Sequence, residues 1–145
     1  MNRAPRLIGY QYIQSIGWAE EIGVFLAVTK DLRLLEISPA GDIRELPAMA
    51  YRLPTVSPNG RWWAYIHLAQ RAGIFAGEYG VDLQPIFDGE IASGGMIFSP
   101  DGNSLFFVTK AGELYRAQAP NWSPVLLASG LTSAFGSTDM AWWEG

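Results

Sequence analysis

Few residues of this chain could take part in nucleophilic or metal chemistry. Cysteine is absent, and the only histidine is His67, within the apolar run "WWAYIHL" at 62–68. Thiolate metal sites and a cysteine nucleophile are therefore impossible, and His67 has no partner ligand at a fixed spacing. The Gly-x-Ser-x-Gly pattern of a serine nucleophile is also missing. We expect no catalytic residue, no metal and no cofactor.

Carboxylates are more numerous, and two groups of them lie close together in the sequence. Glu20 and Glu21 are adjacent, and Asp88 and Glu90 flank a glycine. Paired carboxylates can perform glycoside hydrolysis, and they can also bind cations or basic ligands. Glu20 and Glu21 occupy a predicted turn, so we expect them to face solvent. Asp88, Glu90 and Asp139 are the candidates for a ligand or cation site at an opening of the fold.

Composition indicates a folded domain of many short strands. Hydrophobic residues make up 49% of the 145 residues and aromatic residues 13%, with sixteen Gly and nine Pro as punctuation. This composition predicts one domain over 1–145. A net charge of −4 argues against a nucleic-acid partner. No apolar run suits a signal peptide or a membrane span, so we expect a cytoplasmic protein without a membrane partner.

The carboxylates must be positioned by elements that recur along the chain. The phrase "TVSPNG" at 55–60 returns as "IFSPDG" at 97–102, an offset of 42 residues. The phrase "VTK" at 28–30 returns at 108–110, an offset of 80, which leaves a step of 38 before the 42. Periods of this size indicate a repeat architecture.

Each repeat contains four short segments rich in aromatic and β-branched residues and bounded by turn residues, which predicts four strands. A sustained helical periodicity is absent. The predicted segments are 16–18, 24–29, 32–37 and 42–46; 55–56, 62–68, 73–79 and 83–87; and 96–98, 104–109, 113–118 and 124–128. Four strands per repeat of about 40 residues are typical of a β-propeller blade. The predicted blades are 12–50, 51–92 and 93–136, and "GEIASGG" at 89–95 reads as an inter-blade loop.

The repeated phrase is a hairpin turn, in which Pro presets the first corner, Asp or Asn suits the second, and Gly takes positive φ. Residues 97–115, "IFSPDGNSLFFVTKAGELY", resemble the TolB-type, WD-like β-propeller repeat, which has an "FSPDG" turn and a "G-x-LY" strand. The second repeat keeps "SPNG" but has "GIF" in place of "LY", and the first has "WAEEIG" at the turn. The resemblance implies protein–protein interaction as the commonest use.

Three blades cannot close a ring, because propellers have about four to eight. Segments 6–13 and 138–145 read as stray terminal strands. Either the chain is part of a longer propeller, or two copies close a six-bladed ring as a homodimer. We expect the homodimer, with Tyr10, Tyr12, Trp142 and Trp143 at the self-association surface, because two indoles left in water are costly.

Two functional hypotheses follow. The first is a non-catalytic binding or scaffold module that self-associates and mediates protein–protein or ligand interaction. The alternative is a propeller hydrolase, or a propeller fragment of a larger enzyme, with a carboxylate or cation site at the channel mouth. The adjacent Trp62 and Trp63 point to opposite faces of a strand, and we expect both to be buried in a sheet that is covered on both sides.

Overall fold

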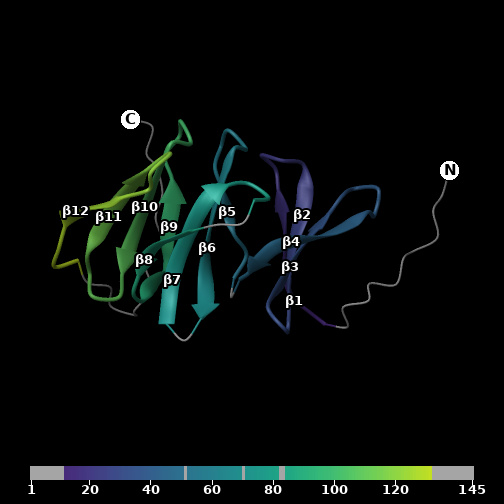
Figure 1. Ribbon diagram of the computed structural model, residues 1–145, viewed down its shortest axis with the longest axis horizontal. Coiled ribbons are helices and arrows are strands. Elements are labelled where there is room, and N and C mark those ends of the chain that lie inside the picture. The colour runs from purple at the N-terminus through teal and green to yellow at the C-terminus, as the bar shows by residue number, and fades with distance from the viewer. Residues whose placement is uncertain (1–11, 51, 70, 82–83, 132–145) are drawn as a thin grey trace.

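The structure, a computed structural model, describes residues 12–50, 52–69, 71–81 and 84–131. These residues form twelve strands in three antiparallel sheets of four, and in each sheet the strands pair in chain order. Figure 1 shows the three sheets standing side by side in the order of the chain. The predicted all-β fold of four-stranded propeller blades is confirmed. No helix among the described residues is long and apolar enough to cross a membrane.

The strand bounds follow the predicted segments closely. The first blade contains β1 (Ile13–Ala19), β2 (Val24–Thr29), β3 (Arg33–Ile37) and β4 (Ile43–Met49). The second blade contains β5 (Thr55–Val56), β6 (Trp62–Ala69), β7 (Arg71–Glu78) and β8 (Gln84–Asp88). The third blade contains β9 (Ile91–Phe98), β10 (Ser104–Thr109), β11 (Leu114–Gln118) and β12 (Pro124–Ala128).

The segment "GEIASGG" is a correction to the sequence analysis. Residues 91–95 belong to β9, which begins before the predicted start of the third blade at residue 93. Glycines in this stretch hide its strand character, since Gly is depleted in strands. Pairing with β10 holds the segment in the sheet. In this pairing Phe107 is opposite Met96 and Thr109 is opposite Ile91.

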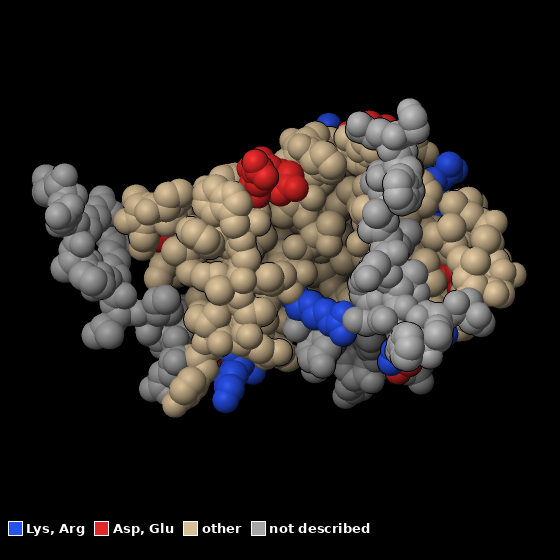
Figure 2. Space-filling model, turned by 180° about the vertical axis from the view of Figure 1, so that it is seen from behind, with Lys and Arg blue, Asp and Glu red and all other residues tan. Residues whose placement is uncertain are grey.

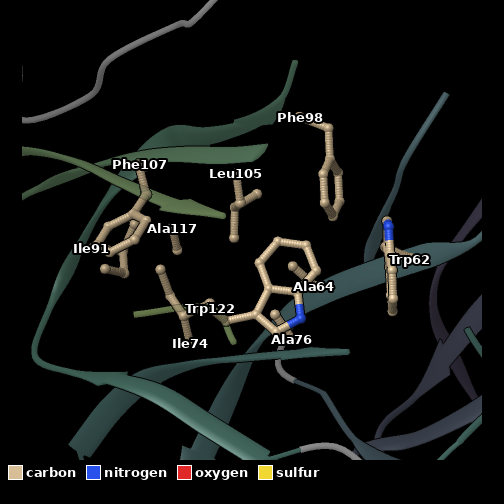
Figure 3. Packing of buried hydrophobic residues seen from close by; sticks show 10 residues of the cluster. All are labelled: Trp62, Ala64, Ile74, Ala76, Ile91, Phe98, Leu105, Phe107, Ala117 and Trp122. Atoms are coloured by element: carbon tan, nitrogen blue, oxygen red, sulfur yellow. The ribbon is translucent and has the colours of Figure 1, made fainter. Parts of the chain in front are cut away.

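The two neighbouring tryptophans of β6 connect all three blades. Trp63 is buried in the core between the first and second blades, and Trp62 is buried in the core between the second and third. Adjacent strand residues point to opposite faces, so the second blade is covered on both sides. The predicted burial of both tryptophans is therefore confirmed. Figure 3 shows the second of these cores, in which the Trp122 indole lies among aliphatic side chains.

Stacked aromatic pairs stiffen the middle of two blades. Tyr65 on β6 stacks on Phe75 of β7, with ring centroids 5.6 Å apart and an interplanar angle of 16°. Phe107 on β10 stacks on Tyr115 of β11 with a spacing of 5.4 Å and an angle of 14°. Such directly opposed pairs stabilise a sheet beyond their buried area. The same register in the first blade pairs Ala27 with Leu35.

The turn between the first two strands has the same hydrogen bonds in the second and third blades. In the second blade, the Ser57 hydroxyl donates to the Asn59 side-chain oxygen and accepts the Trp62 amide at 2.9 Å. The Gly60 amide donates to the Ser57 carbonyl at 2.8 Å. Ser57 is fully buried, so its hydroxyl satisfies a backbone donor that water cannot reach.

In the third blade, the Ser99 hydroxyl donates to Asp101 and accepts the Ser104 amide at 3.1 Å. The hydrogen bond from Ser99 and another from the Asn103 amide hold the pKa of Asp101 below its usual value. The predicted hairpin turn thus has a second purpose, because its serine closes the start of the next strand.

The turns of neighbouring blades also contact each other. The Asn59 side-chain amide donates to the Asp101 carbonyl at 3.3 Å. Gly102 has a φ of +79°, and a Cβ at this position would lie 2.6 Å from the Asn59 side chain. Gly102 is therefore required both by the left-handed backbone and by the approach of the preceding turn.

We predict that Ser57→Ala lowers the free energy of unfolding by about 1–3 kcal/mol, because the buried Trp62 amide loses its acceptor. Ser38→Ala is the matched control, since the Ser38 hydroxyl accepts the Asp42 amide at 3.1 Å in an exposed turn, where water can replace it. Chemical denaturation of both variants measures the difference. Equal losses for the two variants would contradict a specific role of the buried serine.

Candidate functional site: the open face of the first blade

One cross-strand pair recurs where each blade meets the blade before it. Val56 is opposite Trp63 in the second blade, and both are buried in the core shared with the first blade. Phe98 is opposite Leu105 in the third blade, and both are buried in the core shared with the second. This pair of positions is therefore an inter-blade contact that faces the preceding blade.

The equivalent pair in the first blade is Trp18 and Phe25, which are opposite each other on β1 and β2. No described sheet precedes the first blade, and Trp18 is 50% exposed and Phe25 38% exposed. Their rings pack edge to face with centroids 4.9 Å apart. Ile16, two residues before Trp18 on the same side of β1, is 56% exposed. We call Ile16, Trp18 and Phe25 the open face.

The open face is limited in extent. Ala27 and Leu35, further across the same side of the sheet, are fully buried. The exposed apolar surface is therefore a strip along β1 and β2, and two aromatic rings make up most of it. A clustered apolar strip of this kind marks an interaction surface rather than scattered exposure.

The structure places two of the predicted ligand candidates in the connection between β8 and β9. Asp88 is exposed at the end of β8, opposite Gly73. Glu90 is exposed and lies 3.3 Å from the Lys110 ammonium, and its carbonyl accepts the Lys110 amide at 3.0 Å. Asp139 lies outside the described residues. Within the described part of the chain, no three His, Cys, Asp or Glu residues are grouped to hold a metal.

Of the predicted self-association residues, only Tyr12 is described. Tyr12 is exposed just before β1, with the Lys30 ammonium 5.0 Å from its ring centroid. Its carbonyl accepts the Lys30 amide at 3.0 Å, which continues the β1–β2 ladder. Tyr10, Trp142 and Trp143 lie outside the described residues.

A polar contact between the first and second blades had no signal in the sequence. The Tyr79 hydroxyl donates to the Glu36 carboxylate, and Arg44 binds the same carboxylate at 2.9 Å. Burial, together with the hydrogen bond to Glu36, raises the pKa of Tyr79 above its ordinary value. The Tyr79 ring packs on Trp63 with centroids 5.1 Å apart. Because Tyr79 and Glu36 are 43 residues apart, only the packing of two blades brings them together.

A groove of about 440 Å³ lies between the second and third blades. Its walls include Trp62 and Trp122, whose rings pack edge to face with centroids 5.6 Å apart, and Glu78 is also in the lining. Trp122 has a φ of +55°, a strained conformation for a bulky residue. The core between the second and third blades, which contains Trp62, holds the Trp122 indole in place. The sequence analysis missed Trp122 because nothing in its local pattern distinguishes it.

Charged side chains do not form a patch of one sign on the face that Figure 2 shows. Small acidic and basic groups are scattered over that face, with wide uncharged surface around them. Described carboxylates often have a partner, as in the contacts of Glu36 with Arg44, Glu90 with Lys110, and Asp101 within its turn. The shape and apolarity of the open face therefore distinguish it more than charge does.

Comparisons with known proteins place the fold. No protein-family model and no curated protein matches the sequence. Similar solved structures include the β-propeller domain of the Trilobed protease from Pyrococcus furiosus (14% identity, TM-score 0.60, 79% of this chain and 41% of that one). The Cps50 (Swd1) β-propeller domain of Myceliophteria thermophila is also similar (16% identity, TM-score 0.56, 81% and 43%).

A third similar structure is the dihydro-heme d1 dehydrogenase NirN in complex with DHE (19% identity, TM-score 0.61, 78% and 27%). The chain thus spans less than half the length of these structures. At such identities the likeness shows the fold alone, and the fold is that of β-propeller blades. The closer resemblance to the TolB-type repeat stays a prediction.

We predict that Tyr79→Phe lowers the free energy of unfolding by about 1 kcal/mol, because the Glu36 carboxylate loses a donor between two blades. Tyr115→Phe is the control, since that hydroxyl bonds Glu113 within one blade at 3.1 Å. Denaturant titration followed by tryptophan fluorescence compares the two variants. A loss for Tyr115→Phe as large as that for Tyr79→Phe would argue against an inter-blade role.

Proposed function

We propose that this protein is a non-catalytic binding or scaffold module whose blades associate with a second copy of the chain. The observation that carries the proposal is the open face of the first blade. Trp18 and Phe25 occupy positions that are buried between blades in the second and third repeats, yet both remain substantially exposed. A sheet face built for contact with another blade is best satisfied by another blade.

The energetics favour burial of this face. Complete burial of a large apolar side chain is worth about 1.5–3 kcal/mol, and the open face carries three such side chains that are partly exposed. Aromatic residues are enriched in the buried centres of interfaces, where they act as anchors. Most soluble homo-oligomers are closed dimers, so a second copy is the partner that we propose.

The proposal of a non-catalytic role is supported by how the described carboxylates are used. Glu36 connects two blades, Asp101 closes a turn, and Glu90 pairs with Lys110. These contacts give three of the described carboxylates a partner within the fold. Binding through a surface of packed blades is the function that we propose for such an arrangement.

We predict a solution mass near twice 15.9 kDa by light scattering on a sizing column. Trp18→Glu places a charge in the apolar contact and should reduce the mass to about 15.9 kDa. Val81→Glu is the control, because Val81 is equally exposed but lies in the turn between β7 and β8. A wild-type mass near 15.9 kDa at every concentration would contradict the proposal and favour a propeller completed by another polypeptide.

A further inference from the structure

We infer that the open face of one copy docks on the outward face of the third blade of its partner, and that two such contacts close a six-bladed ring. The outward face is the side of the third blade turned away from the second, and it carries Phe106, Arg116 and Val125 in one cross-strand row. This inference rests on the proposed self-association and names the surface that the partner provides.

Two contacts inside the chain show what covers a sheet face that is equivalent to the open face. In the second blade, Trp63 and Tyr65 are covered by Leu26 and Val28 of the first blade. In the third blade, Leu105 and Phe107 are covered by the side of the second blade that carries Ala64 and Ile74. Both contacts therefore join a face that points back along the chain to a face that points forward.

Only one forward-pointing face among the three described sheets has no sheet packed on it, and it is the outward face of the third blade. Phe106 occupies the position of Ala64, since Phe106 is opposite Arg116 as Ala64 is opposite Ala76. Val125, opposite Arg116 on β12, is 49% exposed. The outward face thus has the same position in its blade as the surface that covers the next blade inside the chain, with Arg116 where the second blade has Ala76.

A hollow of about 230 Å³ on the outward face supports this pairing. It is lined by Arg116, Gln118, Ala119, Asn121, Ser123 and Val125. The equivalent part of the second blade, around Ala76 and Glu78, faces the β11–β12 turn of the third blade, which carries Trp122. In the ring, the partner's β3–β4 turn, residues 38–42, would approach the hollow in the same way.

Symmetry makes the arrangement closed. Each copy contributes one open face and one outward face, so a two-fold axis generates two identical contacts. The six blades lie within the four to eight that propellers contain. A contact between two open faces would instead leave both outward faces without a sheet packed on them.

The test compares neighbouring residues on β12. Val125→Glu changes the outward face, whereas Leu126→Glu changes the opposite side of the same strand, where Leu126 is opposite Tyr115 and is 50% exposed. We expect Val125→Glu to halve the mass seen by light scattering and Leu126→Glu to leave it unchanged. Circular dichroism and thermal unfolding show that both variants fold. A Val125→Glu protein that stays dimeric would overturn the inference.

Mixing gives a second measurement. Trp18→Glu retains an intact outward face and Val125→Glu retains an intact open face, so an equimolar mixture can form one of the two contacts. We expect a dimer peak in the mixture that neither variant shows alone, at higher protein concentration than the wild type requires. A mixture that stays monomeric at every concentration would overturn the inference. A monomeric wild type would instead overturn the proposed self-association.

Discussion

One constraint holds the described blades together: an apolar sheet face is removed from water only where a neighbouring sheet packs on it. The second blade satisfies this constraint with two adjacent tryptophans, one turned to each neighbour. The alternation of side chains along a strand makes such double coverage possible with only four strands. On the first blade a described sheet packs on one side only, and on the other side Trp18 and Phe25 are partly exposed although Ala27 and Leu35 are buried.

Polar groups keep the blades in register while apolar burial supplies most of the stability. Asn59 reaches from its own turn to the turn of the third blade, and Glu36 accepts Tyr79 from the second blade. Hydrogen bonds of this kind add little net free energy, but they are directional, so they favour one relative placement of the sheets. The result is three sheets packed in chain order, with defined faces at the two ends.

The functional proposals follow from this arrangement of the sheets. A sheet face held in one orientation can recognise a complementary face without reorganisation, which lowers the entropic cost of association. The outward face of the third blade has the same strand register as the face that covers a blade inside the chain. Arg116 and Val125 are paired between β11 and β12 in the same way as residues of β7 and β8 are paired in the second blade. Similar solved structures that share the fold include a protease and a dehydrogenase, so the proposed role rests on the end faces rather than on the fold.

The sequence by itself determined the strands, the turns and the blade count of the described region. Runs such as 104–109 and the turns at Ser57 and Ser99 depend on residues a few positions apart, whose preferences are local. Tertiary structure alone decided that residues 91–95 join β9, that Glu36 meets Tyr79, that Trp122 packs on Trp62 and that Lys110 pairs with Glu90. These contacts depend on how one sheet is placed against the next, and a repeat period specifies that blades are adjacent without specifying which side chains meet.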